Sequence, residues 1–246
     1  MLEVPNTLEE AVNQAKQAAK LALKAGVSPL QIELVIPEIA LQAQSLALEF
    51  VSLFEGDESG LKVLFPDTGA AALARRDWGE TAFKVSDLGS RFTSIEMKIS
   101  DDDQAFLVVC PSSVEVGIVE KLCNLAGDRP VVLLIPQLED VSIVGIGYAA
   151  RQLRERFLNT LQSVYYFRPL EGVVVLRSYP SQWQVYLETE NGYQFIAEAS
   201  EKPAGEPLEL LIANTLKGDE EKSNNATAKK SGLFTSMQRF LRALSQ

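Results

Sequence analysis

The chain has 246 residues and a formal net charge of −10, with 46% hydrophobic and 23% charged residues. This composition is typical of a globular protein with a sizeable core. Residues 225–246 hold four basic and no acidic side chains, so −10 − 4 = −14 remains for residues 1–224. An acidic surface repels phosphates and argues against a general role in nucleic-acid binding.

The chain contains no histidine and only two cysteines, Cys110 and Cys123. Without histidine the Ser-His-Asp and Cys-His mechanisms and the commonest metal ligand are excluded. The first residues have neither a basic region nor an apolar region of the kind that signal peptides carry. We therefore expect free thiols in a reducing, cytoplasm-like compartment, and neither a metal nor a cofactor.

The first predicted elements alternate between helix and strand. Thr7-Leu-Glu-Glu10 is a capping box that predicts a helix over 7–26. The apolar spacing then predicts a strand at 32–36 and a helix at 39–54.

The same alternation continues to residue 161. Further strands are predicted at 61–65, 95–99, 105–110 and 131–135, and helices at 69–78, 114–125 and 149–161. Continuous Val/Leu/Ile runs between helices are typical of parallel strands that are covered on both faces. The three aspartates at 101–103 are interpreted as a solvated turn.

The pattern becomes antiparallel after Pro169. A strand is predicted at 172–179, followed by a hairpin of 183–188 and 193–198. Asn191-Gly192 between these strands is the preferred pair for a type I′ turn. A last helix is predicted at 207–216. The predicted fold class is α/β, a three-layer sandwich with a largely parallel central sheet that a C-terminal antiparallel hairpin extends.

Four predicted strands stop at a proline, namely Pro37, Pro66, Pro111 and Pro136. Proline lacks an N–H donor and ends ladder pairing, so these residues mark the carboxyl edge of the sheet, where α/β proteins bind ligands. The candidate ligand residues at this edge are Glu38, Asp67, Thr68, Ser112, Ser113 and Gln137. Alternatively, Asp67 or Thr68 and the two serines are helix N-caps, since no histidine is present to activate a serine.

The C-terminal region predicts two segments after an α/β domain at 1–217. Residues 218–230 contain no apolar residue larger than alanine and are expected to be a disordered linker. Residues 231–246 predict a basic amphipathic helix, which would bind a membrane surface, a groove in a partner protein or the protein's own body. Its apolar side is Leu233, Phe234, Met237, Phe240, Leu241 and Leu244, with Arg239 and Arg242 opposite.

Three segments carry a resemblance to a known family: 65–78, 109–113 and 165–169. They resemble an uncharacterised family of cyanobacteria and chloroplasts, and the resemblance covers about residues 7–216. The plant members of this family include the low photosystem II accumulation assembly factor. A similar domain is appended to some chloroplast adenylate kinases, but this chain has no phosphate-binding loop and the kinase activity is not transferred.

The resemblance implies a non-enzymatic accessory factor that assists the biogenesis of photosystem II or another photosynthetic complex, and it implies no catalytic residues. The expected partners are photosynthetic membrane-protein subunits or other assembly factors. The expected location is the cytoplasm, with peripheral association at the cytoplasmic face of the thylakoid through the C-terminal helix. The alternative is a soluble enzyme, or a small-molecule or nucleotide-binding protein, that uses the carboxyl edge of the sheet.

Overall fold

A computed structural model describes residues 2–89, 93–139, 148–205 and 207–212. The strands are β1 (Leu30–Leu34), β2 (Leu61–Phe65), β3 (Lys84–Asp87), β4 (Ala105–Val109), β5 (Val131–Leu134), β6 (Gln162–Leu170), β7 (Val173–Ser178), β8 (Trp183–Thr189) and β9 (Gly192–Ala199). The helices are α1 (Leu8–Lys24), α2 (Ala43–Val51), α3 (Thr68–Trp78), α4 (Val116–Ala126) and α5 (Tyr148–Arg156). The short 3-10 helices are Ile39–Gln42, Ser52–Phe54, Glu58–Gly60, Ile95–Met97 and Leu158–Thr160.

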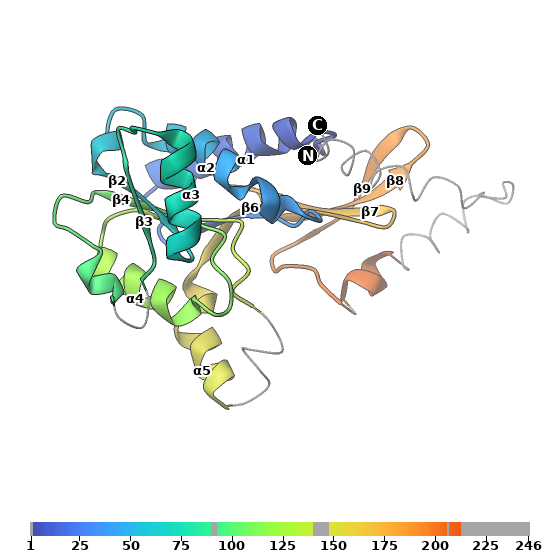
Figure 1. The fold of residues 1–246 in the computed structure, drawn as a ribbon. Helices are drawn as coiled ribbons and strands as arrows, with labels where there is room; N and C mark the ends of the chain where they lie inside the picture. Colours follow the sequence, from blue (N-terminus) through green and yellow to red (C-terminus); the bar gives the residue numbers. More distant parts are fainter. Residues whose placement is uncertain (1, 90–92, 140–147, 206, 213–246) are drawn as a thin grey trace, which may run out of the picture. The chain divides into compact units, whose positions relative to one another are not determined.

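The strands pair in the order β3-β2-β4-β5-β1-β6-β7-β8-β9 (Figure 1). The pairs β3-β2, β2-β4, β4-β5 and β5-β1 are parallel, whereas β6 to β9 form an antiparallel meander. The predicted α/β fold class with a largely parallel sheet is therefore confirmed. The antiparallel part is larger than the predicted extension, because β6 belongs to it.

The contacts divide the chain into two compact units. One, here the parallel unit, comprises Ala19–Glu33 and the described residues of Ile39–Val164. The other, here the meander unit, comprises the described residues of Met1–Ala18, Leu34–Glu38 and Tyr165–Gln246.

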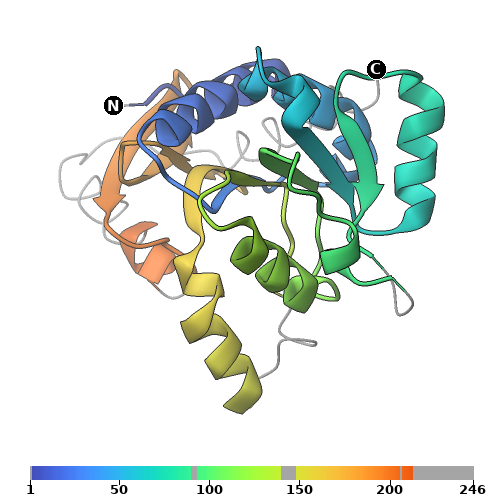
Figure 2. The same cartoon turned by 90° about the vertical axis from the view of Figure 1, so that its left-hand side faces the viewer.

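The central strands of the parallel unit have no solvent-facing side. Every residue of β2, β4 and β5 is buried, which explains their continuous apolar sequences. On one face Leu64, Phe106 and Leu133 pack against α4, α5 and the 3-10 helices around Ile95 and Leu158. Figure 2 shows α4 and α5 together on that side. On the other side of the strands α2 packs against β4, and α3 against β2 and β3.

The meander unit builds a second core on one face of its strands. Tyr166, Val175, Trp183 and Val185 are buried there together with Leu208, which lies in a short helix at 207–212. The chain's first residues are attached to the opposite face. The Tyr186 hydroxyl donates to the Leu2 carbonyl at 2.7 Å, and the Leu2 N–H donates to Gln184 Oε1 at 3.1 Å.

The capping box at the start of α1 is confirmed with one difference. The Glu10 N–H donates to Thr7 Oγ1 at 3.1 Å, as expected. The Glu10 carboxylate reaches one residue further back than predicted and accepts the Asn6 N–H at 2.7 Å. Both contacts satisfy backbone donors that a helix start leaves without an internal partner.

The strand predicted at 95–99 is wrong. Residues Ile95–Met97 form a 3-10 helix, and the edge strand β3 lies earlier, at Lys84–Asp87. The alternation of apolar side chains misled the prediction because Met97 is 75% exposed and only Ile95 is buried in the core. The Lys98 carbonyl accepts a hydrogen bond from the Lys62 ammonium.

Helix 149–161 was also predicted too long. Helix α5 ends at Arg156, and a 3-10 turn leads into β6, which the prediction missed. Tyr165 and Phe167 of β6 are fully buried. Of the last predicted helix, 207–216, the structure describes 207–212 as helical, and the remainder lies outside the described residues. The predicted linker and C-terminal helix, 218–246, also lie outside them.

The β8-β9 hairpin is confirmed, but its predicted type I′ turn is wrong. That turn needs positive φ at both central residues. Thr189 pairs with Gly192, so Glu190 and Asn191 form the loop, and neither has a positive φ. The positive φ lies instead at Gly192, which has φ 112° and pairs with Thr189.

The predicted solvated turn at 101–103 is only partly correct. Asp101 and Asp102 are exposed, whereas Asp103 is fully buried. Its carboxylate accepts from the Lys62 ammonium, from Lys84 Nζ at 2.8 Å and from the Ser100 N–H at 2.8 Å. Desolvation raises the pKa of Asp103, but the hydrogen bonds from Lys62, Lys84 and Ser100 outweigh it, and the pKa lies below its usual value.

We predict that Asp103→Asn lowers the free energy of unfolding by about 3 kcal/mol, because it leaves the buried Lys62 ammonium without its counter-charge. Urea denaturation at pH 7 measures the change. Asp101→Asn is the matched control, since Asp101 is exposed in the same turn, and it should change the free energy by less than about 0.5 kcal/mol.

The pH dependence gives an independent readout of the same carboxylate. A pKa that folding lowers contributes stability above the unfolded-state pKa of about 4, and that contribution is lost as the pH falls through the folded-state value. The wild type should therefore lose more stability than Asp103→Asn between pH 7 and pH 3. Parallel pH profiles of the two proteins would contradict the role given to Asp103.

Candidate functional site

The carboxyl edge of the parallel strands lies where the prolines predicted it. Strands β2, β4 and β5 are neighbours in the sheet and end at Phe65, Val109 and Leu134. Pro66, Pro111 and Pro136 follow within two residues of these ends. We call the residues that follow β2, β3, β4 and β5 in this unit the carboxyl rim.

The fourth proline belongs to the meander unit. Pro37 comes three residues after the end of β1, and Glu38 follows it with an exposed side chain and φ 60°. Glu38 is thus a turn residue of that unit and is left out of the carboxyl rim.

The segments after β4 and β5 continue to pair beyond the regular strands. The Cys110 N–H donates to the Leu134 carbonyl and the Gln137 N–H donates to the Pro111 carbonyl, both at 2.8 Å. Ser112 and Gln137 form a parallel bridge. The structure therefore brings two of the predicted rim residues together.

This pairing holds two residues in an unfavourable backbone conformation. Cys110 has φ 46° and Ile135 has φ 51°, and each directly precedes a proline. The left-handed region costs an L-residue about 1–2 kcal/mol, and residues before proline ordinarily adopt extended conformations. Such strain persists where surrounding contacts fix it, and it concentrates at functional sites. No motif in the sequence predicts these two backbone conformations.

The serines after Pro111 are engaged within the rim. Glu115 Oε2 accepts from the Ser112 N–H at 2.9 Å and from the Ser112 hydroxyl at 2.6 Å. Ser113 is buried. The predicted N-cap role is wrong for both serines, because Glu115 occupies the N-cap position of α4. The Ser-x-x-Glu spacing of 112–115 was the available signal for this contact.

Asp67 is the N-cap of α3, as the alternative interpretation predicted. Its Oδ1 accepts the Ala70 N–H at 2.9 Å, and the side chain is otherwise exposed. Thr68, the next residue, hydrogen-bonds to Asp87 and thereby links the start of α3 to the end of β3. The Asp-Thr-Gly triplet at 67–69 thus serves as a strand-to-helix turn.

Asp87 is a rim residue that the sequence reasoning missed. It ends β3 opposite Phe65, and only 3% of it is exposed. Its carboxylate accepts from Lys98 Nζ at 3.0 Å and from the Gly89 N–H at 2.9 Å. Desolvation raises the pKa of Asp87. The hydrogen bonds to its carboxylate, of which the one from Lys98 has the largest effect, outweigh desolvation and hold the pKa below its usual value. No motif marks this residue, because β3 itself was not predicted.

Gly89 fixes the shape of the turn after Asp87. Its φ is 108°, and a Cβ there would lie 2.5 Å from the Thr93 carbonyl oxygen. A side chain at this position would therefore displace the segment that begins at Thr93. Lys98, which bonds to Asp87, lies in that segment.

The two cysteines are free thiols, as expected. Burial raises the pKa of each to about 12, so neither is a thiolate at neutral pH. In the described part of the chain there is no group of three or more Asp, Glu, Cys or His that could hold a metal ion.

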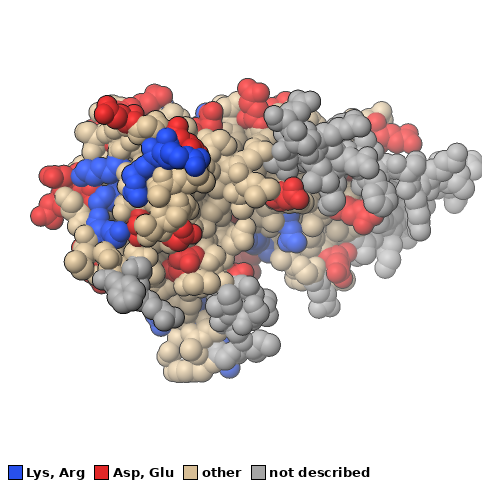
Figure 3. Space-filling model, viewed as in Figure 1, with Lys and Arg blue, Asp and Glu red and all other residues tan. Residues whose placement is uncertain are grey.

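The surface around the rim carries both signs of charge. Figure 3 shows basic and acidic side chains interspersed over the visible face of the parallel unit. Several of these groups are paired: Arg156 Nε lies 2.6 Å from Glu120, and Arg75 donates to the Val85 carbonyl at 3.0 Å. No helix among the described residues is both long and apolar enough to cross a bilayer.

A glycine variant is usually less stable than the alanine variant at the same position, and we predict that the backbone strain at Cys110 reverses this order. Cys110→Gly should be more stable than Cys110→Ala by about 0.5–1 kcal/mol, because glycine adopts positive φ without penalty. Cys123, inside α4, is the control: there the glycine variant should be less stable than the alanine variant by about 1 kcal/mol. Urea denaturation of the four variants measures both differences, and the same order at both sites would refute strain at Cys110.

Comparison with known proteins places the chain in a family but gives no solved relative. No solved structure matches it significantly. A family model described as a domain of unknown function, DUF1995, matches residues 5–210. That range includes both compact units up to the short helix at 207–212 and stops before the basic C-terminal segment. The chain belongs to the DUF1995 family.

Proposed function

We propose that the protein is a non-enzymatic accessory factor that associates with the cytoplasmic face of the thylakoid membrane and assists the biogenesis of a photosynthetic complex, with photosystem II as the first candidate. The resemblance of segments 65–78, 109–113 and 165–169 supports the photosynthetic role. All three segments lie within residues 5–210, which the DUF1995 family model matches.

One observation supports a non-enzymatic role. The polar side chains of the carboxyl rim are bonded to other groups of the protein. The Ser112 hydroxyl donates to Glu115, the Asp67 carboxylate caps α3, and Asp87 is bonded to Lys98. A catalytic nucleophile needs an adjacent base that is free to accept its proton, and here the carboxylates are already bonded to backbone and side-chain groups that hold the turns. The rim is thus organised to fix the turns between strands and helices.

The uneven distribution of charge supports the peripheral membrane contact. The acidic residues lie before residue 225, whereas 231–246 combines Arg239 and Arg242 with an apolar side. A basic amphipathic segment binds an anionic interface by inserting its apolar side while its cations approach the headgroups. The family match ends at residue 210, so this segment is an addition to the shared domain. The domain would contact photosynthetic membrane-protein subunits or other assembly factors.

We predict that deletion of 231–246 moves the protein from the membrane fraction to the soluble fraction of fractionated cells, by at least fivefold in their ratio. Two full-length variants separate the causes. Phe234→Ser with Phe240→Ser removes apolar contact and keeps the charge, and Arg239→Gln with Arg242→Gln does the reverse. Both should weaken association, and only the arginine variant should lose the salt dependence. Unchanged association of the deletion variant would refute the membrane role of this segment.

A second candidate function is small-molecule or nucleotide binding at the carboxyl rim. The strained residues Cys110 and Ile135 favour it, since strain of this kind is typical of ligand-contacting loops. Among the predicted residues of the carboxyl rim, those exposed to a ligand are Asp67, Thr68 and Gln137.

For this candidate we predict a rise in melting temperature of more than about 2 °C with a nucleotide or a pigment precursor, and loss of that rise in Asp67→Asn. Asp101→Asn, on an exposed turn at the other end of the strands, is the control. The absence of a shift in the wild type across such a screen would count against a rim ligand.

A further inference from the structure

The meander unit carries a cluster of basic side chains on the face that holds its core. Lys202 Nζ lies 4.2 Å from the centre of the Tyr166 ring, and Arg177 lies 5.2 Å from the centre of the Trp183 ring. The two rings are in edge contact, with centroids 5.0 Å apart. Both rings are nearly fully buried, so they hold the two cations in place without being available to stack on a ligand themselves.

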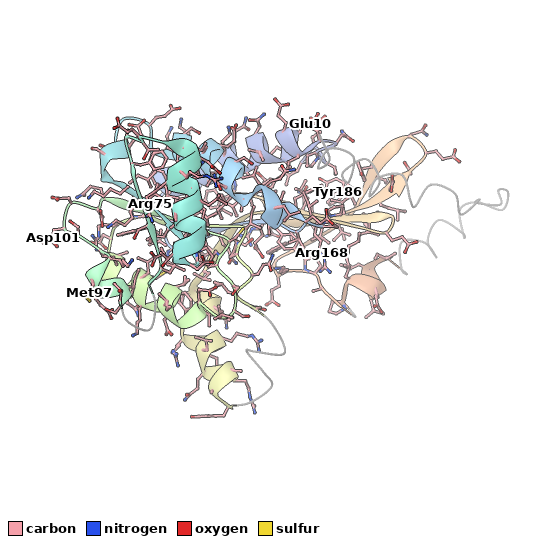
Figure 4. The ribbon with its side chains drawn as sticks, in the orientation of Figure 1. Glu10, Arg75, Met97, Asp101, Arg168 and Tyr186 are labelled. Atoms are coloured by element: carbon pink, nitrogen blue, oxygen red, sulfur yellow. The ribbon has the colours of Figure 1, made fainter. Side chains whose placement is uncertain are left out.

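Arg168 brings a third cation to the same face. It lies two residues after Tyr166 on β6, and side chains two apart on a strand share a face. In register, Tyr166 pairs with Arg177 and Arg168 pairs with Val175, so the two arginines occupy diagonal positions on neighbouring strands. Diagonal neighbours are about 7–8 Å apart, within reach of long side chains. Figure 4 shows Arg168 on the opposite face of the meander from Tyr186.

Arg168 differs from the other two cations in its contacts. Its side chain is half-buried, yet it makes no hydrogen bond or ion pair with any residue in the part of the chain that the structure describes. A half-buried guanidinium has lost part of its hydration, and it ordinarily gains a carboxylate or a phosphate in exchange. Here two further cations lie beside it, in a protein whose net charge is −10.

We propose that Arg168, Arg177 and Lys202 form a binding site for a phosphoryl group. The planar guanidinium of Arg168 presents parallel N–H donors that match two oxygens of one phosphate, and the other two cations add charge from the side. The site lies within the meander unit, is separate from the carboxyl rim, and does not depend on the proposed function.

The same chemistry has two sources, a free phosphate compound or the headgroup of an anionic phospholipid. The first arm of the test measures the melting temperature of the full chain with sodium phosphate and pyrophosphate at constant ionic strength. The second measures co-flotation of the full chain with phosphatidylglycerol vesicles, with phosphatidylcholine vesicles as reference. The variants are Arg168→Gln, Lys202→Gln and, as a matched control, Arg154→Gln on the exposed side of α5.

We expect saturable binding in one of the two arms, weakened at least tenfold in Arg168→Gln and severalfold in Lys202→Gln, and unchanged in Arg154→Gln. Arg168→Lys keeps the charge but loses the paired donors, and it should recover only part of the affinity. Arg168→Gln removes no hydrogen bond or ion pair to another described residue, so it should fold like the wild type. Equal binding of wild type and Arg168→Gln, equal loss in Arg154→Gln, or no saturable response in either arm overturns the site.

Discussion

The complete burial of β2, β4 and β5 is the constraint on which the parallel unit depends. A strand covered on both faces can carry only apolar side chains, unless a polar group brings its own partner. Lys62 is the polar exception within these strands. Its ammonium is satisfied by Asp103 and by the Lys98 carbonyl, and this requirement shapes residues 95–103 before β4. The turn at 100–103 and the 3-10 helix at Ile95–Met97 both supply that partner structure.

The pairing of the buried strands extends into the carboxyl rim. The first residues after β4 and β5 continue it, with left-handed conformations at Cys110 and Ile135. The rim's polar side chains bond to one another and to helix starts. These bonds are the basis of the proposed scaffold role, and the strain at Cys110 and Ile135 is the basis of the second candidate, ligand binding.

The meander unit has a different organisation and a different kind of surface. Its core lies on one side of four antiparallel strands, and its aromatic residues are bordered by Arg168, Arg177 and Lys202. This cluster gathers three basic residues that are up to 34 positions apart in the sequence. Pairing of β6 with β7 brings the two arginines together.

The sequence by itself determined the fold class, the buried strands, the capping box of α1 and the proline edge, because each follows from local periodicity or from the chemistry of one residue type. Only the tertiary structure decided that Asp103 is buried, that 95–99 is not a strand, and that Asp87 lies at the rim, bonded to Lys98. These features depend on partners distant in sequence or on backbone angles, and a residue pattern reports neither. A lysine inside an apolar strand, such as Lys62, indicates that a counter-charge is needed. Which of the three aspartates at 101–103 supplies it depends on the packing of the sheet.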